Sequence, residues 1–278
     1  MNNIKIIAGI VSYNPDIARL RENILAIINQ VCSLTIFVNG KESEASTRAA
    51  IKGIDHIDLI ISSKNKGIAY ALKRIMQYAI DNNADWVLSL DQDSVCQPGL
   101  ISEYTKYLNL PNVGMLSCII ADRNTNKKLG NVDREYKEIN DAITSAALTN
   151  VSAYEQINGY DEKLFIDCVD FDISFQLRKA GYKIYRINYY GLLHELGHGT
   201  RHRLCNKEIT TLNYSPFRQY YQSRNWLYLR QKYPEFMPFI HTIKVELITQ
   251  LGILFFEDKK WRKLTARWRG IRDSRRMA

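Results

Sequence analysis

The sequence predicts an α/β protein: a mostly parallel sheet flanked by helices, followed by a C-terminal helical appendage. Short apolar runs alternate with helix-patterned segments from residue 4 to residue 95, the order that produces βαβ units and a parallel sheet. From residue 216 onward the chain is patterned as helices. The composition is that of an ordinary globular protein, with 46% hydrophobic and 24% charged residues, and this allows a sizeable core.

Strands and helices follow one another in order through the first half. Residues 4–13 form a short apolar run that ends at Asn14-Pro15, which indicates a buried strand and then a loop. Residues 16–30 place apolar side chains at helical spacing. The pattern continues with strands at 33–40, 56–63 and 85–94 and with a helix at 68–82.

The second half is less regular. A strand is expected at 113–120 and a helix over about 170–180. The aromatic-rich stretch from residue 216 predicts a helix that ends near Pro234, and one final helix follows. We therefore expect one domain over residues 1–215, made of halves 1–95 and 96–215, and C-terminal helices over 216–278.

The net charge of +9 is concentrated at the C-terminus. Residues 259–278 hold nine Lys/Arg and one Asp, so the rest of the chain is nearly neutral, and the sequence indicates no nucleic-acid partner. Five cysteines are scattered without a C-x-x-C pair, which is typical of a reducing cytoplasm. We expect no apolar run of the ~18–20 residues that span a bilayer, and no signal peptide, because the N-terminal apolar run predicts a buried strand.

Polar residues follow the predicted strands of the first half. In open parallel sheets, ligands bind beyond the carboxyl ends of the strands, and these loops contain Asn14, Asn39, Asn65 and Asp91–Asp93. Asp91 and Asp93 come directly after a buried strand, and two hard carboxylates in one turn suit Mg²⁺ or Mn²⁺ with a diphosphate. The alternative is a solvated turn. Neither a dinucleotide-binding fingerprint nor a P-loop is present.

A second acidic cluster lies among apolar residues. It consists of Asp161, Glu162, Asp167, Asp170 and Asp172. Carboxylates in apolar surroundings can have a raised pKa and act as general bases. The alternative is that they cap a helix, since Asp favours the first turn.

The stretch "LLHELGHGTRH" fits the zinc-protease pattern H-E-x-x-H with His194, Glu195 and His198, and His202 adds a third histidine. That chemistry needs the motif within a helix. Three glycines in or beside the motif each cost a helix up to ~1 kcal/mol, and the residues before it alternate like a strand. The alternatives are a zinc metallohydrolase, loop histidines without a ligand role, and a contact to a metal or diphosphate.

Several stretches together resemble a known family: "VSYNPD", "NKGIAYALK", "LSLDQDS", "TSAALT", "NGYDEKLFIDCVDFDISFQLRKAGY", "LLHELGH" and "RQYYQSRN". Their order is similar to that of inverting family 2 glycosyltransferases of the GT-A fold, most of all the bacterial rhamnosyltransferases of O-antigen and other surface polysaccharides. The resemblance covers nearly the whole chain. It implies a Rossmann-like GT-A domain with a nucleotide-sugar-binding half at 1–95 and an acceptor-binding half at 96–215.

The resemblance also implies roles for individual residues. Asp91 is expected to contact the ribose and the metal, Asp93 to hold the metal, Mn²⁺ or Mg²⁺, and His194 to lie near the metal or diphosphate. Asp170 is the expected catalytic base. The nucleoside pocket is expected to be lined by Asn14, Asn39, Asn65 and Gly67.

Two positions depart from the family pattern. Val38 replaces the Asp that reads the base, which leaves the nucleotide base open, and Val169 replaces the Glu before the catalytic Asp. The family implies dTDP-L-rhamnose as donor and a lipid-linked saccharide as acceptor. A non-catalytic carbohydrate- or lipid-binding module is the remaining alternative, although such a module has no need of two acidic clusters.

The basic tail predicts a membrane contact. Trp261, Leu264, Trp268 and Ile271 are spaced to share one helix face, with most of the basic residues on the other faces. Such a helix lies in a bilayer interface and is attracted to anionic lipid. We therefore expect a cytoplasmic protein, peripheral on the inner face of the cell membrane through residues 259–278. The alternative is a basic helix packed on the rest of the protein.

Overall fold

In the computed structural model of this chain, the described residues are 4–123, 128–194, 200–204 and 207–277, with the side chains of 201–210 left out. The chain divides into two units. The first unit comprises Met1–Glu162 and Val169–Glu195, and the second comprises Lys163–Cys168 and Leu196–Ala278. The unit with the C-terminal helices thus also includes chain before residue 215.

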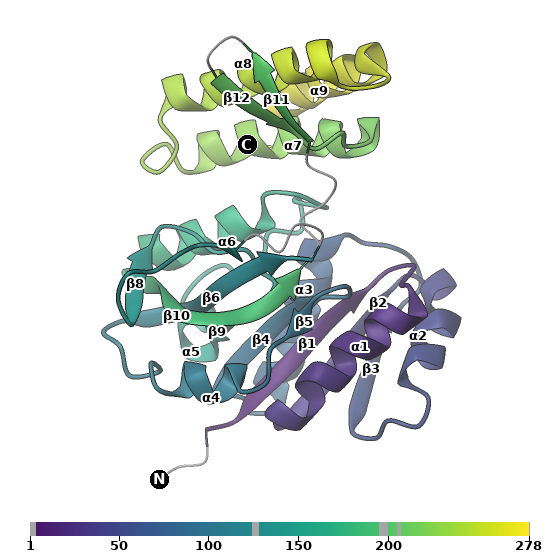
Figure 1. Cartoon of the computed structure of the whole chain (residues 1–278), viewed down its shortest axis with the longest axis vertical. Coiled ribbons are helices and arrows are strands. Elements are labelled where there is room, and N and C mark those ends of the chain that lie inside the picture. Colours follow the sequence, from purple (N-terminus) through teal and green to yellow (C-terminus); the bar gives the residue numbers. More distant parts are fainter. Residues whose placement is uncertain (1–3, 124–127, 195–199, 205–206, 278) are drawn as a thin grey trace. The chain divides into compact units, whose positions relative to one another are not determined.

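The first unit is built on one mixed sheet (Figure 1). Its strands are β1 (Ile6–Ser12), β2 (Ser33–Asn39), β3 (Ile57–Ser62), β4 (Trp86–Asp91), β5 (Val95–Cys96), β6 (Val113–Asp122), β7 (Lys128–Leu129), β8 (Tyr136–Ile139), β9 (Ala147–Asn150) and β10 (Lys183–His194). The order is β3-β2-β1-β4-β9-β6-β10-β5, with β7 paired to β6 and β8 to β10.

The first four strands in this order are parallel, as the alternation of strands and helices predicts. Ser12 aligns with Val38, Asn39 with Ser62 and Val11 with Asp91, so the carboxyl ends of these strands meet at one edge of the sheet. Beyond β4 the sheet is mixed, because β9 runs antiparallel to β4 and β6 while β10 runs parallel to β6.

Helices of the first unit are α1 (Ile17–Ile27), α2 (Glu44–Ile51), α3 (Ile68–Asp81), α4 (Leu100–Thr105), α5 (Val151–Glu155) and α6 (Val169–Lys179), with short 3₁₀ turns at Ile28–Gln30 and Lys41–Ser43. The Asp16 side chain caps α1 by accepting from the Arg19 N–H at 3.0 Å. α3 lies so close to β1 that a Cβ at Gly9 would overlap Ile75. The predicted α/β class is therefore confirmed, with helices fixed by caps and close packing.

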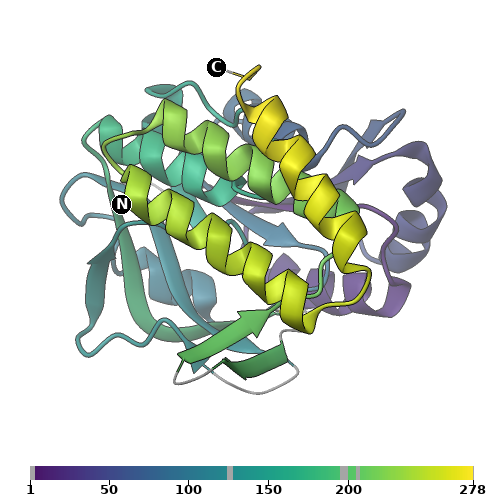
Figure 2. The same ribbon diagram turned by 90° about the horizontal axis from the view of Figure 1, so that it is seen from above.

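The second unit is a hairpin followed by helices. The hairpin is formed by β11 (Thr200–Leu204) and β12 (Lys207–Thr211), and the helices are α7 (Pro216–Lys232), α8 (Phe239–Phe256) and α9 (Lys260–Ser274). The expected single final helix is thus two, with a break at Glu257–Lys259. Figure 2 shows the three helices together, and α9 packs on α7 so closely that Gly270 lies against the Tyr220 carbonyl.

The expectation that no segment is long and apolar enough to span a membrane was wrong by length and composition. α8 has 18 residues with a mean hydropathy of 1.4, and 22% of it is buried. Lys244 and Glu246 interrupt its apolar run in the sequence, but the helix as a whole still averages as apolar. α8 is therefore an apolar helix of which only a small part is buried.

A short stretch in the middle of the chain belongs to the second unit. The Arg224 guanidinium donates to the Lys163 carbonyl at 2.6 Å, and the Asn225 amide donates to the carbonyls of Ile166 and Asp167 at 2.8 and 3.0 Å. Asp167 and the next residue, Cys168, have φ values of 66° and 65°, which non-glycine residues adopt uncommonly. The α7 side chains thus hold the unusual backbone that leads directly into α6.

Candidate metal and nucleotide-sugar site

The turn after β4 is fixed from several directions. The Asp91 carbonyl accepts from the Asn23 amide at 2.6 Å and from the Ser94 N–H at 3.2 Å. The Gln92 side chain accepts from the Tyr13 N–H at 2.8 Å and donates to the Tyr13 carbonyl at 3.1 Å. The loops after β1 and β4 are therefore held together at the carboxyl edge of the parallel strands, which fixes the backbone that carries Asp91 and Asp93.

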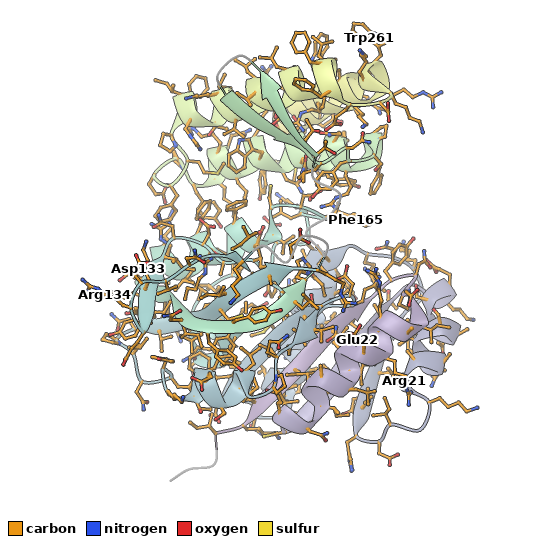
Figure 3. All side chains as sticks on the ribbon, in the orientation of Figure 1. Arg21, Glu22, Asp133, Arg134, Phe165 and Trp261 are labelled. Carbon is orange, nitrogen blue, oxygen red and sulfur yellow. The ribbon has the colours of Figure 1, made fainter. Side chains whose placement is uncertain are left out.

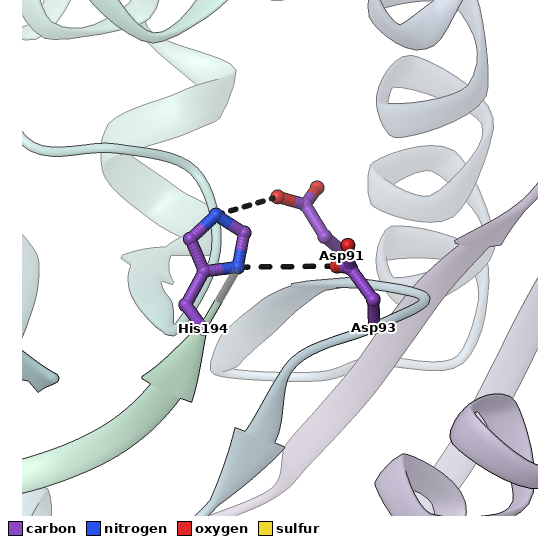
Figure 4. A group of neighbouring side chains, drawn as sticks. All are labelled: Asp91, Asp93 and His194. Carbon is purple, nitrogen blue, oxygen red and sulfur yellow. Dashed lines mark ion pairs between the residues drawn. The ribbon is translucent and has the colours of Figure 1, made fainter. Parts of the chain in front are cut away.

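His194 reaches this turn from the other half of the sheet. It is the last residue of β10, which pairs antiparallel with β5 next to the turn and parallel with β6. Its Nε2 lies 3.9 Å from Asp91 Oδ2, and its Nδ1 lies 3.9 Å from Asp93 Oδ1 (Figure 4). One ligand atom from each of the three residues lies within 4.8 Å of the others. The sheet thus brings together all three of the predicted metal ligands.

Two serines hold the histidine ring. Ser94 Oγ lies 2.8 Å from His194 Nδ1 and 2.7 Å from Ser145 Oγ, and Ser145 Oγ also accepts from the Asp91 N–H at 3.2 Å. If the Nδ1–H donates to Ser94, the lone pair of Nε2 is available to a metal. This hydroxyl chain links the histidine to the backbone of the acidic turn, so the three ligands are positioned as one unit.

The carboxylates have the surroundings of a cation site. Asp93 Oδ1 is buried and has no hydrogen-bond partner among the residues that the structure describes. A buried carboxylate oxygen without a partner is costly, and a divalent cation bound between Asp91, Asp93 and His194 would satisfy it. The side chains of Asp91, Asp93 and His194 are 40%, 35% and 14% exposed, respectively, so a ligand can reach them from solvent. Two oxygen donors and one imidazole fit Mn²⁺ and, with more water, Mg²⁺.

The predicted nucleoside residues lie at the same edge, and two of them shape the loop before α3. Asn39 is 3% exposed, accepts from the Lys66 N–H at 2.9 Å and donates to the Gly67 carbonyl at 3.3 Å. Asn65 accepts from the Gly67 N–H at 2.9 Å, and Gly67 begins α3 with a φ of 88°. Their contact with a nucleotide stays a prediction, and the structure adds that both hold the loop.

The other two positions in this region differ in exposure. Asn14 is exposed, and its N–H donates to Ser43 Oγ at 2.8 Å. Val38, which stands where the family has its base-reading Asp, is completely buried. The Val38 side chain therefore contributes to the core and offers no polar group to a base.

The second acidic cluster separates into different environments. Glu162 forms an ion pair with Lys73 at 3.0 Å in the first unit. Asp167 forms a two-pronged ion pair with Arg218 in the second unit, at 2.5 and 3.3 Å. Asp172 is completely buried and accepts from the Gln176 amide at 2.8 Å. Asp170, in the first turn of α6, is only partly buried. It is therefore more accessible to a substrate than the completely buried Asp172.

The Asp170 carboxylate affects the pKa of a buried tyrosine. Burial raises the pKa of the Tyr160 hydroxyl, the neighbouring Tyr154 and the Asp170 carboxylate raise it further, and a hydrogen bond with Ser89 opposes them. Ser89 lies on β4 two residues before Asp91, so the two side chains share a face of the strand. Asp170 thus lies close enough to Tyr160 to affect its pKa, within the unit that contains the acidic turn.

The zinc-protease interpretation of the histidine motif does not agree with the strand at His194. That chemistry needs both histidines on one helix, whereas His194 ends β10. Glu195 and His198 lie outside the described residues, as does the side chain of His202 on β11. His194 instead meets the acidic turn.

Sequence reasoning missed the residues that support the site. Ser94 and Ser145 hold His194, and Asn23 and Gln92 fix the turn. Ser145 lies in "TSAALT", one of the stretches that carry the family resemblance. Gln92 and Ser94 lie in "LSLDQDS", another of these stretches. Nothing in the local pattern of Asn23 distinguishes it from a surface amide, because its partner is far along the chain.

Comparisons with known proteins agree with this geometry. The family model described as "Glycosyl transferase family 2" matches residues 8–171. The chain is 26% identical over 274 residues to the dTDP-rhamnosyl transferase RfbF of Shigella flexneri, covering 93% of this chain and 91% of that protein.

A solved structure shares the fold. The crystal structure of GalNAc-T7 with UDP, GalNAc and Mn²⁺ matches with a TM-score of 0.62 and 12% identity, covering 83% of this chain and 48% of that one. At this identity the match shows the fold alone. The family match spans more than half of the chain and contains the acidic turn and the first turn of α6, so this protein is a glycosyltransferase that belongs to glycosyl transferase family 2.

Proposed function

We propose that this protein transfers L-rhamnose from dTDP-rhamnose, with inversion, to a hydroxyl of a lipid-linked saccharide in surface polysaccharide (O-antigen) synthesis. The observation that carries the donor assignment is the similarity to a dTDP-rhamnosyl transferase along 93% of the chain. The cluster of Asp91, Asp93 and His194 supports a diphosphate-bearing donor, because it is suited to a divalent cation.

Asp91, Asp93 and His194 hold Mn²⁺ or Mg²⁺ in this proposal. The bound cation neutralises the charge that develops on the diphosphate leaving group. The chain's own contribution is to fix the three ligand side chains: Ser94 holds the imidazole, and the Asn23 bond holds the turn.

The nucleoside lies over the loops at the carboxyl ends of β1–β4. Asp91 is the candidate ribose contact, with Asn14, Asn39, Asn65 and Gly67 forming the pocket. Because Asn39 and Asn65 already bond to the backbone at Lys66 and Gly67, we expect them to act by shaping the loop. The buried Val38 offers no hydrogen bond to the base, so base recognition falls to other groups.

Asp170 is the proposed base. Its carboxylate takes the proton of the acceptor hydroxyl. The acceptor oxygen forms a bond to the anomeric carbon from the side opposite the diphosphate, and the bond from that carbon to the diphosphate oxygen breaks with its electron pair. One displacement of this kind inverts the configuration, through a transition state that resembles an oxocarbenium ion.

The acceptor assignment fixes the place of the reaction. A nucleotide sugar is a cytoplasmic metabolite and a lipid-linked saccharide lies in a membrane, so we place the protein in the cytoplasm at the inner face of the cell membrane. The excess of basic residues over 259–278 supports this placement, because an anionic leaflet attracts them.

The test is a donor panel with the full chain. dTDP-rhamnose, UDP-glucose, UDP-GalNAc and GDP-mannose are compared in Mn²⁺, Mg²⁺ or chelator, by thermal shift and by hydrolysis of the donor. We expect dTDP-rhamnose to give the largest metal-dependent shift and the fastest hydrolysis. A preference for another nucleotide sugar would overturn the donor assignment, and full activity in excess chelator would overturn the metal site.

A further inference from the structure

The second unit has charged groups in its interior. Glu246 and Arg267 have side chains 5% and 4% exposed and form an ion pair between α8 and α9. Ser223 on α7 donates to Glu246 at 3.1 Å, and the Arg267 guanidinium donates to Gln219 on α7 at 2.6 Å. One polar network therefore joins all three helices at their centre.

A second internal pair lies at the break between α8 and α9. Lys263 and Glu257 have side chains 3% and 4% exposed and lie 2.8 Å apart, and both also bond to Asn213. Two of the nine basic residues of the tail, Lys263 and Arg267, are thus neutralised inside the unit. The face of α9 that packs consists of Lys263, Ala266, Arg267, Gly270 and Ser274.

Large apolar side chains lie on the outside of α8. Ile240 is 81% exposed, Leu247 55%, Leu251 45% and Phe255 58%. Their spacing of seven, four and four residues places them on one face of the helix, and Ile248 joins them at 41% exposed. In a helix that contacts only its own protein and water, the hydrophobic effect turns such a face toward the core. This face is exposed, so it is suited to a nonpolar partner.

The tryptophans of α9 extend this face. Trp261 is 72% and Trp268 64% exposed, and Trp261 projects from the unit in Figure 3. The indole of Trp268 donates to Gln250 of α8 at 3.1 Å, so the outward faces of the two helices adjoin. Leu264 and Ile271, which the sequence groups with the tryptophans, are half-buried instead.

Positive charge lies on and beside the apolar face, with Lys244 four residues after Ile240. The exposed basic residues of α8, α9 and their flanks are Lys244, Lys259, Lys260, Arg262, Arg269, Arg272, Arg275 and Arg276. Asp258 is the one exposed acid among the described residues 239–277, since Glu246 and Glu257 are buried in ion pairs and Asp273 is bonded to Arg272 and Tyr220. The surface therefore combines apolar side chains, tryptophans and an excess of exposed cations over exposed acids.

We propose that the α8–α9 surface, defined by Ile240, Leu247, Ile248, Leu251, Phe255, Trp261 and Trp268, docks on the interface of an anionic phospholipid bilayer. The aliphatic side chains enter the boundary between headgroups and acyl chains, the tryptophans sit at headgroup level, and the basic rim meets the lipid phosphates. This deepens the proposed function, on which it rests for the lipid-linked acceptor, and it adds the outer face of α8 to the basic tail.

The same contacts show why α8 lies in the interface and does not cross the bilayer. Crossing would take Glu246 from Arg267 and Ser223 into hydrocarbon, and removing one partner of a buried ion pair is strongly destabilising. In-plane docking leaves the internal network intact and covers only the outer face. A second copy docked through the same surface would need acidic groups there to match the cations, and the described part of this surface exposes one acid, Asp258.

The test is flotation of the full chain with vesicles of phosphatidylcholine alone or with phosphatidylglycerol. We expect binding to the anionic vesicles, weakened by salt, with a blue shift of tryptophan fluorescence. The variant L247Q/L251Q/F255Q and the variant K260Q/R262Q/R269Q should each lose at least about tenfold in vesicle affinity. The matched control is L25Q, which changes an exposed leucine of α1 and should bind like the unchanged chain.

Other results would overturn the docking proposal. They are equal binding to neutral and anionic vesicles, unchanged binding in both triple variants, or no vesicle binding together with self-association that the L247Q/L251Q/F255Q change abolishes. Circular dichroism and donor hydrolysis confirm that the variants are folded. Vesicle binding without turnover of dTDP-rhamnose would contradict the proposed donor and leave the lipid surface standing.

Discussion

The two units of this protein use charged residues in opposite ways. The first unit has an apolar sheet core and places Asp91, Asp93 and His194 at a strand edge, where they remain partly exposed. The second unit buries the ion pairs Glu246–Arg267 and Lys263–Glu257 and exposes large apolar side chains.

The difference shows that a carboxylate's role depends on what is paired with it. In the first unit, a buried oxygen of Asp93 lacks a hydrogen-bond partner among the described residues, which suits a site that binds a cation. In the second unit, Glu246 is surrounded by Arg267, Ser223 and Gln250, which suits a structural link between helices. Four predictions follow from this contrast, from the largest effect to the smallest.

Asp93→Asn should lower sugar transfer by about 10³-fold or more, because a cation at a developing leaving-group charge supplies several kcal/mol. Calorimetric titration with Mn²⁺ should show the binding lost, while thermal unfolding changes little. The matched control is Asp55→Asn, at an exposed aspartate before β3. If the Asp93 variant binds Mn²⁺ as well as the unchanged chain, Asp93 is not a cation ligand. The contrast between cation-binding carboxylates in the first unit and structural carboxylates in the second would then fail.

Asp170→Asn should lower the transfer rate by ~10²–10⁴-fold, the usual contribution of a general base, with Mn²⁺ and donor binding retained. Single-turnover transfer and donor titration measure the two effects separately. Asp172→Asn, at a completely buried position bonded to Gln176, should instead lower the free energy of unfolding. If both variants are fully active, the cluster at the start of α6 is structural.

Glu246→Gln should destabilise the protein by roughly 3–5 kcal/mol, because it leaves the Arg267 charge buried without its partner. The double change Glu246→Leu with Arg267→Met removes both charges and should be close to neutral or stabilising. Urea unfolding followed by circular dichroism gives both values. If the Glu246→Gln variant is as stable as the unchanged chain, the internal polar network contributes nothing to the stability of the second unit. The contrast between the two units would then fail for the second unit.

Ser94→Ala should weaken Mn²⁺ binding by about 10–100-fold, the usual cost of losing a group that orients a metal-ligating histidine. The serine itself is outside the ligand set, so activity should recover at saturating Mn²⁺. Calorimetry and the Mn²⁺ dependence of transfer check this, with Ser46→Ala on α2 as a matched control. A loss of activity that excess Mn²⁺ cannot restore would indicate a direct role in the reaction.

Local pattern was enough for most strands and helices of the first half. The apolar run at 4–13 became β1 and the helical period at 16–30 became α1, because side-chain periodicity decides these elements before any long-range contact forms. The short helix α2 was missed. The strands β8 and β9 were missed as well, since each pairs with a strand far along the chain. The final helix was predicted as one because the break at Glu257–Lys259 contains no glycine or proline.

The candidate site, like the fold, could be predicted from the sequence only in part. The sequence identified Asp91 and Asp93 by their position after a strand, and His194 and Asp170 through the family resemblance. It gave no sign that Ser94 and Ser145 support His194, because that contact arises only where β10 runs beside β5. The acidic cluster at 161–172 looked uniform in sequence, whereas packing assigned Glu162, Asp167 and Asp172 to separate partners.

The sequence by itself determined the α/β class, the acidic turn, the family and the concentration of charge in the tail. These properties follow from residue type and spacing along one stretch, or from motifs in a fixed order. Only the tertiary structure decided which charges lie inside. Lys263 and Arg267 look like surface cations in the tail, but their partners Glu257 and Glu246 lie on the chain before α9. Folding α9 onto α7 and α8 buries these charges and leaves Trp261 and Trp268 exposed, because a helix can turn only one face inward.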